Sequence, residues 1–410
     1  MLDKYTIKDV IDEVIDYRGK TPKKLGGDWS EVKTDYMALS AKNIKKGRIV
    51  QPDTIRYVDQ EMYNKWMKQE VERGTVLITS EAPFGELLYW DSNDKIVLSQ
   101  RLFGLKIKKE FNSRYIYYYM FSEQFQGELS GRATGSTVIG LRQPELLKCH
   151  LKIPNRKYQD IIAAMLMNID KKIDLNNEIN NNLYEFNNKL FEEKILNNAE
   201  KDDWEEYLLS DISKMINGYL YKGNELVEKS NIGMATIKNF ERTGGFKLDG
   251  FKDIVPQKCK SDHYVKPFEI LVACTDLTQN ADIIGNAIML LNNANYDEII
   301  MSMDLVKLIP ITDIVNNYML YAIVNSKDFK NFALRYKSGT TVLHLNKNCF
   351  KEYTIKLPNY NTIKDLSKVF EGNYKKISQI IDENRKLEQL RDTLLPKLMN
   401  GEIDLDNIEV

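Results

Sequence analysis

The stretch GSTVIGLRQPELLKCHLKIPN at residues 135–155 returns in altered form as GTTVLHLNKNCFKEYTIKLPN at residues 339–359. The two align without a gap at an offset of 204, and seven of the 21 positions are identical. The similarity extends upstream, where YMALSAKNI at 36–44 resembles GMATIKNF at 233–240 and RYIYYYMFSEQF resembles NYMLYAIVNSKDF. Related segments at a fixed offset indicate a duplicated structural unit. The sequence therefore predicts a tandem duplication.

Each copy of the unit divides into two parts of different character. The first part combines short β-branched and aromatic runs, such as TVLIT and LFGLKI, with glycine, proline and asparagine turns, which predicts an α+β lobe with a curved sheet. The second part lacks such turns and follows a helical period. The predicted divisions are a first lobe at 1–155, a first helix at 156–200, a second lobe at 201–359, and a second helix with the C-terminal tail at 360–410.

A heptad seam runs through both predicted helices in the same register. Its spacing alternates between four and three residues, which places the seam on one helix face and is typical of a coiled coil. The seam residues are Ile173, Asn180, Leu183, Leu190, Ile377, Asn384, Leu387 and Leu394. Asn180 and Asn384 are polar, and a buried polar residue on a seam lowers stability while it fixes alignment.

Chain order decides how the two helices pair. A helix of about 40 residues is ~60 Å long, so the first helix carries the chain away from the first lobe. If the second helix pairs with the first, it must run back antiparallel. The predicted fold is therefore α+β, with two duplicated lobes separated by two long helices that form an antiparallel coiled coil.

Composition narrows the class of protein only a little. The net charge is −1, and residues 1–155 form the one division with a positive balance, 25 Lys and Arg against 21 Asp and Glu. No segment is long and apolar enough to span a membrane, and the start MLDKYTIKDVIDEV has no signal-peptide pattern, so a cytoplasmic protein is expected. The four cysteines form no Cys-x-x-Cys pair and are interpreted as buried thiols. They are Cys149, Cys259, Cys274 and Cys349.

A pair of related lobes at a fixed separation suits a long, rigid ligand, and duplex DNA is such a ligand. A ~60 Å spacer places the lobe centres at most about 15 to 18 base pairs apart, at ~3.4 Å per pair. Glycine turns could hold phosphates with hydroxyl and N–H groups, and the basic run KNIKKGR supplies cations. The candidate DNA contacts are Lys42, Asn43, Lys45, Lys46, Arg48, Arg132, Ser136, Thr137, Lys238, Asn239, Lys337, Ser338, Thr340 and Thr341. The alternative is that these residues are helix caps and solvated loops.

The order of these elements resembles the specificity subunit of type I restriction-modification systems. The resemblance rests on the opening IKDVIDEVIDYRGKTP, the Gly-Ser/Thr-Val-x-x-Leu phrase, the IPN or LPN that closes each lobe, and the tail ENRKLEQLRDTLLPKLMNGEIDL. It covers essentially the whole chain. One departure is that the second lobe opens with GYLYKGNE in place of YRGKTPKK, so the two openings are not expected to contact DNA identically.

The resemblance implies a non-catalytic subunit with two target-recognition domains that read a bipartite, asymmetric DNA sequence. It implies two modification subunits as partners, which bind S-adenosylmethionine and methylate adenine. Restriction subunits, which use ATP and Mg²⁺ to translocate and cleave DNA, would complete the complex. No cofactor is expected on this chain itself.

Two other classes of protein stay open on sequence alone. An adenine methyltransferase needs an Asn/Asp-Pro-Pro-Tyr/Phe loop, and the nearest stretch, Glu81-Ala82-Pro83-Phe84, lacks its polar group. Glu31-Val32-Lys33 and Glu192-Glu193-Lys194 fit a nuclease triplet but arise by chance in a chain rich in Glu and Lys. No P-loop is present. Cys259 and His263 are two potential metal ligands without further ligands nearby in sequence, so they do not predict a metal site. A scaffold that joins proteins without binding DNA is the remaining alternative.

Overall fold

The chain folds as two compact units, each of which includes part of both long helices. The structure is a computed structural model that describes residues 2–135, 139–242, 244–278 and 280–406. Unit 1 comprises Met1–Lys172 with Leu387–Val410, and unit 2 comprises Ile173–Lys386. Within the described residues, no helix is both long and apolar enough to cross a membrane.

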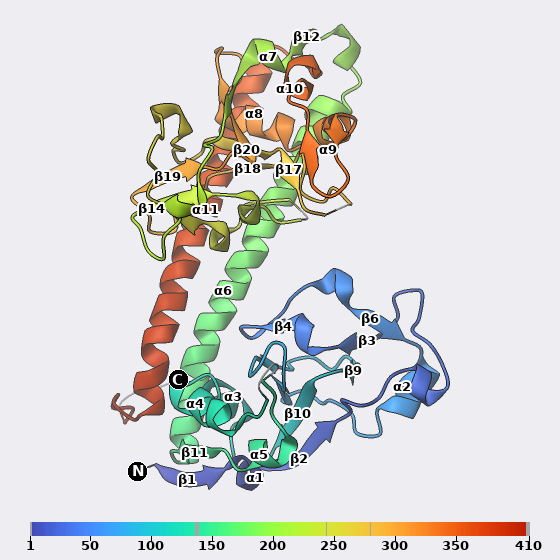
Figure 1. Ribbon diagram of the computed structural model, residues 1–410, viewed down its shortest axis with the longest axis vertical. Helices are drawn as coiled ribbons and strands as arrows, with labels where there is room; N and C mark the ends of the chain where they lie inside the picture. The colour runs from blue at the N-terminus through green and yellow to red at the C-terminus, as the bar shows by residue number, and fades with distance from the viewer. Residues whose placement is uncertain (1, 136–138, 243, 279, 407–410) are drawn as a thin grey trace. The chain divides into compact units, whose positions relative to one another are not determined.

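Unit 1 is built on a four-stranded antiparallel sheet and a smaller mixed sheet (Figure 1). The first has the order β2 (Ile11–Asp16), β10 (Leu102–Ile107), β7 (Val76–Thr79), β8 (Leu87–Tyr89), and the second β6 (Arg56–Val58), β3 (Tyr36–Leu39), β9 (Ile96–Leu98). Two strand pairs are β1 (Asp3–Thr6) with β11 (His150–Ile153) and β4 (Ile44–Lys45) with β5 (Arg48–Ile49). The short helices are α1 (Ile7–Val10), α2 (Gln60–Trp66), α3 (Ser113–Tyr119), α4 (Glu123–Arg132) and α5 (Gln143–Leu147).

Unit 2 repeats this plan with its own strands. Its four-stranded sheet has the order β13 (Ser213–Asn217), β20 (Leu305–Pro310), β16 (Ile270–Ala273), β18 (Ala287–Met289), and its mixed sheet β15 (Lys252–Asp253), β14 (Ile232–Ala235), β19 (Glu298–Met301). The remaining strands are β12 (Glu205–Leu208) with β23 (Thr354–Leu357), and β17 (Thr275–Asp276), β22 (Leu343–Leu345), β21 (Lys337–Ser338). The short helices are α7 (Leu209–Ile212), α8 (Asn317–Val324), α9 (Lys327–Leu334) and α10 (Cys349–Glu352).

The strand orders confirm the predicted duplication. The order β2-β10-β7-β8 corresponds strand for strand to β13-β20-β16-β18, and β6-β3-β9 corresponds to β15-β14-β19. In both small sheets the central strand pairs antiparallel on one side and parallel on the other. This combination of one parallel and one antiparallel pairing in both small sheets is expected of a duplicated unit. The sheets and helices together confirm the predicted α+β class.

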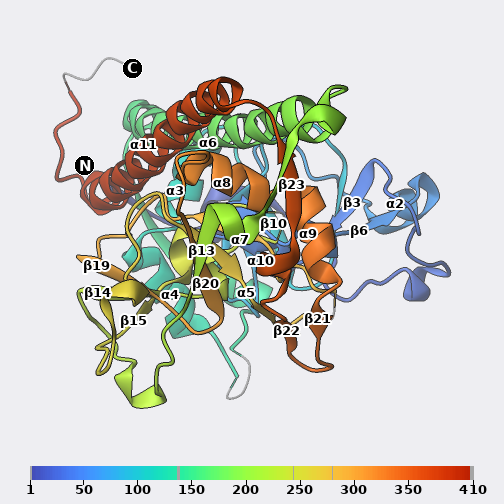
Figure 2. The same cartoon turned by 90° about the horizontal axis from the view of Figure 1, so that it is seen from above.

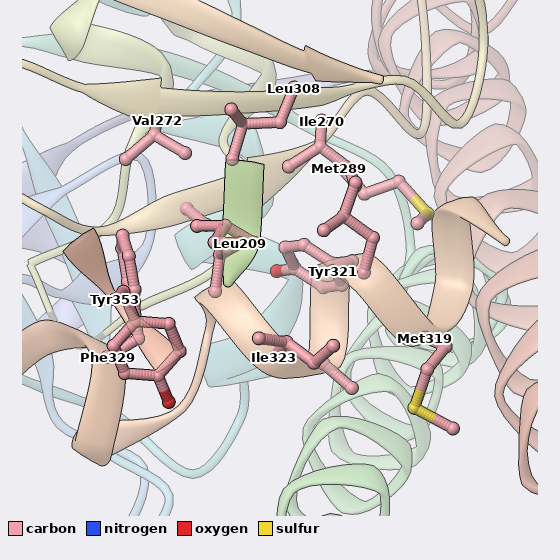
Figure 3. Packing of buried hydrophobic residues seen from close by; sticks show 14 of the residues in the cluster. Leu209, Ile270, Val272, Met289, Leu308, Met319, Tyr321, Ile323, Phe329 and Tyr353 are labelled. Carbon is pink, nitrogen blue, oxygen red and sulfur yellow. The ribbon is translucent and has the colours of Figure 1, made fainter. Parts of the chain in front are cut away.

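The core of unit 2 lies between its large sheet and helices α8 and α9 (Figure 3). Ile270 pairs with Met289 on one side and with Leu308 on the other, so one row of apolar side chains crosses three strands. Phe329 and Tyr353 complete the core edge to face, with ring centroids 5.1 Å apart. Each fully buried side chain of this size contributes about 1.5 to 3 kcal/mol relative to exposure.

The long helices α6 (Arg156–Phe191) and α11 (Tyr360–Met399) begin directly after the asparagine of the two Pro-Asn pairs. Asn155 Oδ1 accepts from the backbone N–H of Tyr158 at 3.0 Å, and Asn359 Oδ1 accepts from that of Thr362 at 3.1 Å. Such N-caps satisfy a backbone donor that the first helical turn leaves unpaired. The repeated Pro-Asn is therefore the start signal of each helix.

Within each unit, the parts of α6 and α11 pair antiparallel. In unit 2, Asn176 lies opposite Asn384 and Asn187 opposite Asn373, and α8 packs against both helices (Figure 2). The compact units divide each long helix between them, because each part packs on a lobe as well as on the other helix. The limits predicted for the lobes therefore separate segments that share one core.

Candidate nucleic-acid interface

The repeated glycine phrase forms a hairpin. In unit 2, β21 and β22 pair Lys337 with Leu345 and Ser338 with His344. In unit 1, the bridge between Thr134 and Gly140 falls at the same positions after the offset of 204. The repeated phrase therefore forms the same backbone pairing at equivalent positions in the two units.

The glycine of the phrase is required by backbone geometry. Gly339 has φ +106°, and a Cβ there would lie 2.2 Å from the carbonyl oxygen of Val342. Gly135 in unit 1 has φ +121°. Only glycine adopts such angles without strain. The turn therefore explains why glycine occurs at this position in both copies of the phrase.

Each hairpin is fixed to the same end of its four-stranded sheet. The N–H of Leu345 donates to the carbonyl of Cys274 at 2.8 Å, directly after β16. The N–H of Leu141 donates to the carbonyl of Ser80 at 2.9 Å, directly after β7, the strand that corresponds to β16. The end of the sheet that carries the hairpin is called the hairpin end below. The segment that follows the glycine phrase is therefore hydrogen-bonded to the same end of the sheet in both units.

The candidate contacts on the hairpins have different surroundings. In unit 2, four of them are exposed: Lys337, Ser338, Thr340 and Thr341. In unit 1, Ser136 and Thr137 lie outside the described residues. Arg132, the last residue of α4, precedes the hairpin and is ion-paired, with Nε 3.1 Å from Glu128 and a terminal nitrogen 3.8 Å from Glu145. These carboxylates neutralise Arg132, whereas the four candidates of unit 2 are exposed.

A hollow of about 430 Å³ lies beside the unit 1 hairpin. Its lining includes Arg132, Thr134, Arg142 and Glu145. Arg142 is exposed, whereas Arg132 is held by the carboxylate of Glu145. The hollow is thus continuous with the hairpin.

The basic run KNIKKGR forms a second hairpin at the same end of unit 1. Strands β4 and β5 pair Ile44 with Ile49 and Lys45 with Arg48. The backbone N–H of Lys46 donates to the Glu86 carboxylate at 2.6 Å, next to the start of β8. The side chains of the four basic candidates are exposed: Lys42, Lys45, Lys46 and Arg48. Folding therefore brings two segments about 90 residues apart in sequence to one end of the sheet.

The prediction that Asn43 and Asn239 contact DNA is wrong, because both side chains are internal. Asn43 is 1% exposed and Asn239 is fully buried. Each Oδ1 accepts from a backbone N–H three residues earlier, that of Ser40 in unit 1 and that of Thr236 in unit 2. Each Nδ2 donates to backbone carbonyls of the following loop. The repeated Lys-Asn is a capped turn, and only its exposed lysines, Lys42 and Lys238, stay available to a ligand.

Sequence reasoning missed Arg18, which joins the opening of unit 1 to the hairpin. Its guanidinium lies 3.9 Å from the ring centroid of Phe103 and 2.9 Å from the carboxylate of Asp16. It also donates to the carbonyl of Leu141 at 3.3 Å. The position of Arg18 inside the YRGKTP opening was a usable signal, because that opening is absent from the second lobe.

Of the eight predicted seam residues, four are buried and four are partly buried. In unit 2, Ile173 and Ile377 are buried, and Leu183 and Leu190 pack against the core. In unit 1, Leu394 packs against the core, and Leu387 is half-buried. Asn180 and Asn384 are both buried. Their hydrogen bonding differs, and this difference separates the roles of the two asparagines.

Asn384 is fully engaged and Asn180 is not. The Asn384 amide accepts from Asn176 at 2.8 Å and donates to Asn177 at 2.9 Å. The side-chain oxygen of Asn180 is buried and has no hydrogen-bond partner among the described residues. A buried polar atom without a partner costs free energy, whereas a satisfied pair fixes alignment.

We therefore expect opposite effects from two equal substitutions. Asn384→Leu leaves Asn176 and Asn177 short of a partner and should destabilise unit 2 by about 1 to 3 kcal/mol. Asn180→Leu removes an unpaired oxygen and should be neutral or stabilising. Urea unfolding of the full chain, followed by hydrogen exchange in the seam, measures both. Equal losses for the two variants would contradict the assignment of the register to Asn384.

A tandem pair of α+β units, in which the repeated glycine phrase pairs at the same end of each four-stranded sheet, defines a duplicated protein of two related units. The family model for the type I restriction modification DNA specificity domain matches residues 2–185 and 201–391. The chain therefore belongs to this family, as its motifs predict.

Two curated relatives come from Methanocaldococcus jannaschii. The type I restriction enzyme MjaVIII specificity subunit is 24% identical over 143 residues, which are 33% of this chain and 33% of that protein. The MjaIX specificity subunit is 22% identical over 357 residues, 82% of this chain and 79% of that protein. Among solved structures, the type I restriction-modification S subunit from M. genitalium matches with a TM-score of 0.56 and 17% identity, over 97% of this chain and 96% of that chain. That likeness supports the shared fold.

Proposed function

We propose that this chain is the DNA sequence-specificity subunit of a type I restriction-modification complex, and that each unit reads one half of a bipartite, asymmetric target. The observation that carries the proposal is the hairpin present at the same end of both four-stranded sheets. Its unit 2 copy exposes a lysine and three hydroxyls, groups that contact phosphates and base edges. The surrounding residues differ between the units, which suits two different half-sites.

The same proposal makes the chain a recognition subunit without catalytic activity. Among the described residues, no group of three or more His, Cys, Asp or Glu side chains is placed to hold a metal ion. Glu192–Leu196, which contains one nuclease-like triplet, is the last turn of the first long helix and packs through Ile195 on the core. S-adenosylmethionine, ATP and Mg²⁺ are assigned to partner subunits.

A stripe on α6 in unit 2 is the proposed docking face for a modification subunit. Leu175, Ile179 and Phe186 are exposed at 57%, 42% and 51%. Their spacing of four and seven residues places them on one side of the helix, away from the buried seam. Two modification subunits and restriction subunits complete the proposed complex.

Methylome sequencing of cells that carry this gene and its modification partner tests the proposed function. We expect a bipartite methylated motif that disappears when the gene is deleted and returns when it is restored. Loss of methylation at sites unrelated to a bipartite motif, or no change on deletion with the partner expressed, would contradict the proposal.

Replacing Lys337 by Ala should weaken DNA binding by the assembled modification complex in a salt-dependent way. Lys337 is exposed on the hairpin, and removal of one phosphate contact lowers the slope of log K against log salt by about 0.9. Lys364→Ala is the matched control, because Lys364 is exposed on α11. Titrations of a fluorescent duplex at several salt concentrations measure the slope, and equal slopes for both variants would exclude Lys337 as a contact.

A further inference from the structure

Unit 2 exposes three large apolar side chains in the loops at its hairpin end. Leu220 is 71% exposed, Leu277 is 69% exposed and Met303 is 48% exposed. They follow three different strands: β13 ends at Asn217, β17 ends at Asp276, and β19 ends at Met301. Scattered exposed apolar residues are ordinary on a protein surface. These three, however, follow strands of three different sheets that end on the same side of unit 2.

Backbone hydrogen bonds tie these three loops together. The N–H of Tyr219 donates to the carbonyl of Met301 at 2.8 Å, which brings the Leu220 loop to the Met303 turn. The N–H of Cys274 donates to the carbonyl of Asp304 at 2.8 Å, which joins β16 and β17 to the same turn. We call Leu220, Leu277 and Met303 the apolar cluster.

The apolar cluster is continuous with the hairpin that carries the candidate DNA contacts. Strand β17 pairs Thr275 with His344 and Asp276 with Leu343, so Leu277 directly follows a strand of the hairpin sheet. On that hairpin, Lys337 and Thr340 are exposed. A duplex held by the hairpin would therefore meet the apolar cluster as well.

Two acidic groups beside the apolar cluster, Asp276 and Asp304, are engaged inside the protein. The carboxylate of Asp276 accepts from the N–H groups of Thr278 and Ile283 at 2.8 and 2.6 Å. Burial opposes its ionisation, but these backbone hydrogen bonds outweigh burial and hold the pKa of Asp276 below its ordinary value. Asp304 accepts from the hydroxyl of Thr275 at 3.0 Å. The loops therefore expose Leu220, Leu277 and Met303 together with polar and basic side chains such as Lys222 and Asn280.

Apolar side chains read one feature of the major groove, the C5-methyl group of thymine. We propose that unit 2 recognises thymine methyl groups in its half-site through Leu220, Leu277 and Met303. This inference rests on the proposed function, and it names the base chemistry that one unit reads. Burial of one methyl contributes about 0.8 kcal/mol, or about a fourfold change in affinity.

The test replaces thymine by uracil, which removes only the methyl group, at each position of the target defined by methylome sequencing. Binding of the assembled modification complex is measured with Leu277→Ala, Leu220→Ala and the unchanged chain. We expect about fourfold weaker binding of the unchanged chain for at least one uracil in the half-site read by unit 2. The corresponding difference should disappear in Leu277→Ala or Leu220→Ala.

The matched control is Ile311→Ala. Ile311 is 54% exposed and directly follows β20, at the opposite end of the sheet from Met303. This variant should keep the full response to uracil. In every variant, uracil in the other half-site should give the same response as in the unchanged chain.

The inference would be overturned by a unit 2 half-site without an A·T pair, by no response to uracil there, or by a response that persists in both cluster variants. A 2-aminopurine signal of base unstacking without a methyl response would also overturn it, in favour of an inserted wedge. Failure of the proposed function looks different, because the unchanged complex would then bind the target duplex no better than a scrambled one.

Discussion

Replacing residues 1–155 by the first lobe of another family member is expected to change one half of the methylated DNA sequence and leave the other half unchanged. Unit 1 has its own sheets, hairpin and core, so the groups that read one half-site travel with the exchanged segment. Affinity for the original target should fall to the non-specific level, a loss of about 10³-fold or more. Methylome sequencing of cells with the chimaera gives the result directly.

The exchange must preserve the contacts between lobe and helices. The donor lobe should keep a tyrosine at position 118, because the Tyr118 hydroxyl donates to Asp170 of α6 at 2.6 Å. The reciprocal exchange of residues 201–359 is the control and should change the other half-site. A change in both halves from either exchange would contradict modular reading.

Asp170→Ala should destabilise unit 1 by about 2 to 3 kcal/mol, less than the range for a fully buried ion pair because both partners are partly exposed. Asp170 lies 2.9 Å from the guanidinium of Arg391 and accepts the hydroxyl of Tyr118. Burial works against the charge of Arg391, but Asp170 outweighs burial and raises the pKa of Arg391. Burial, and then the charge of Asp170, raise the pKa of Tyr118 above its ordinary value. Removal of the carboxylate leaves both groups without this partner.

A double variant separates loss of the pair from loss of packing. Asp170→Leu with Arg391→Leu should recover most of the stability, because an apolar pair replaces the ion pair without an unpaired charge. Glu61→Ala breaks an exposed ion pair of the same unit with Lys65 and should cost less than about 1 kcal/mol. Urea unfolding and hydrogen exchange in α6 measure all three. If Asp170→Ala matched Glu61→Ala, the three-residue contact would have no special role.

The sequence predicted the features that follow from local pattern. The offset of 204 predicted the duplication, because repeated spacing survives even where individual residues change. The four-and-three period predicted both long helices and their seam, and Pro-Asn marked their first residues. Glycine in the repeated phrase predicted a turn, because a positive φ depends mainly on the identity of the residue that adopts it and not on distant contacts.

The candidate DNA contacts were less predictable, because exposure depends on packing. Asn43 and Lys42 are neighbours in sequence, yet the capped turn buries the amide and exposes the amine. Arg132 and Lys337 are both basic residues that come shortly before the glycine phrase. Arg132, however, forms an ion pair with Glu128, which lies four residues before it on the same helix. Residue type alone does not separate a contact from a cap or an ion pair.

The sequence by itself determined the family, the duplication, the helices and the seam, because these are periodic or repeated features. Only the tertiary structure decided which asparagine of the seam is satisfied and which side chains are exposed at the hairpin end of each unit. Leu220, Leu277 and Met303 are separated by 83 residues of chain between the first and the last. Strand pairing and hydrogen bonds between the loops bring them to the hairpin end of unit 2, and no local sequence pattern predicts that these residues come together.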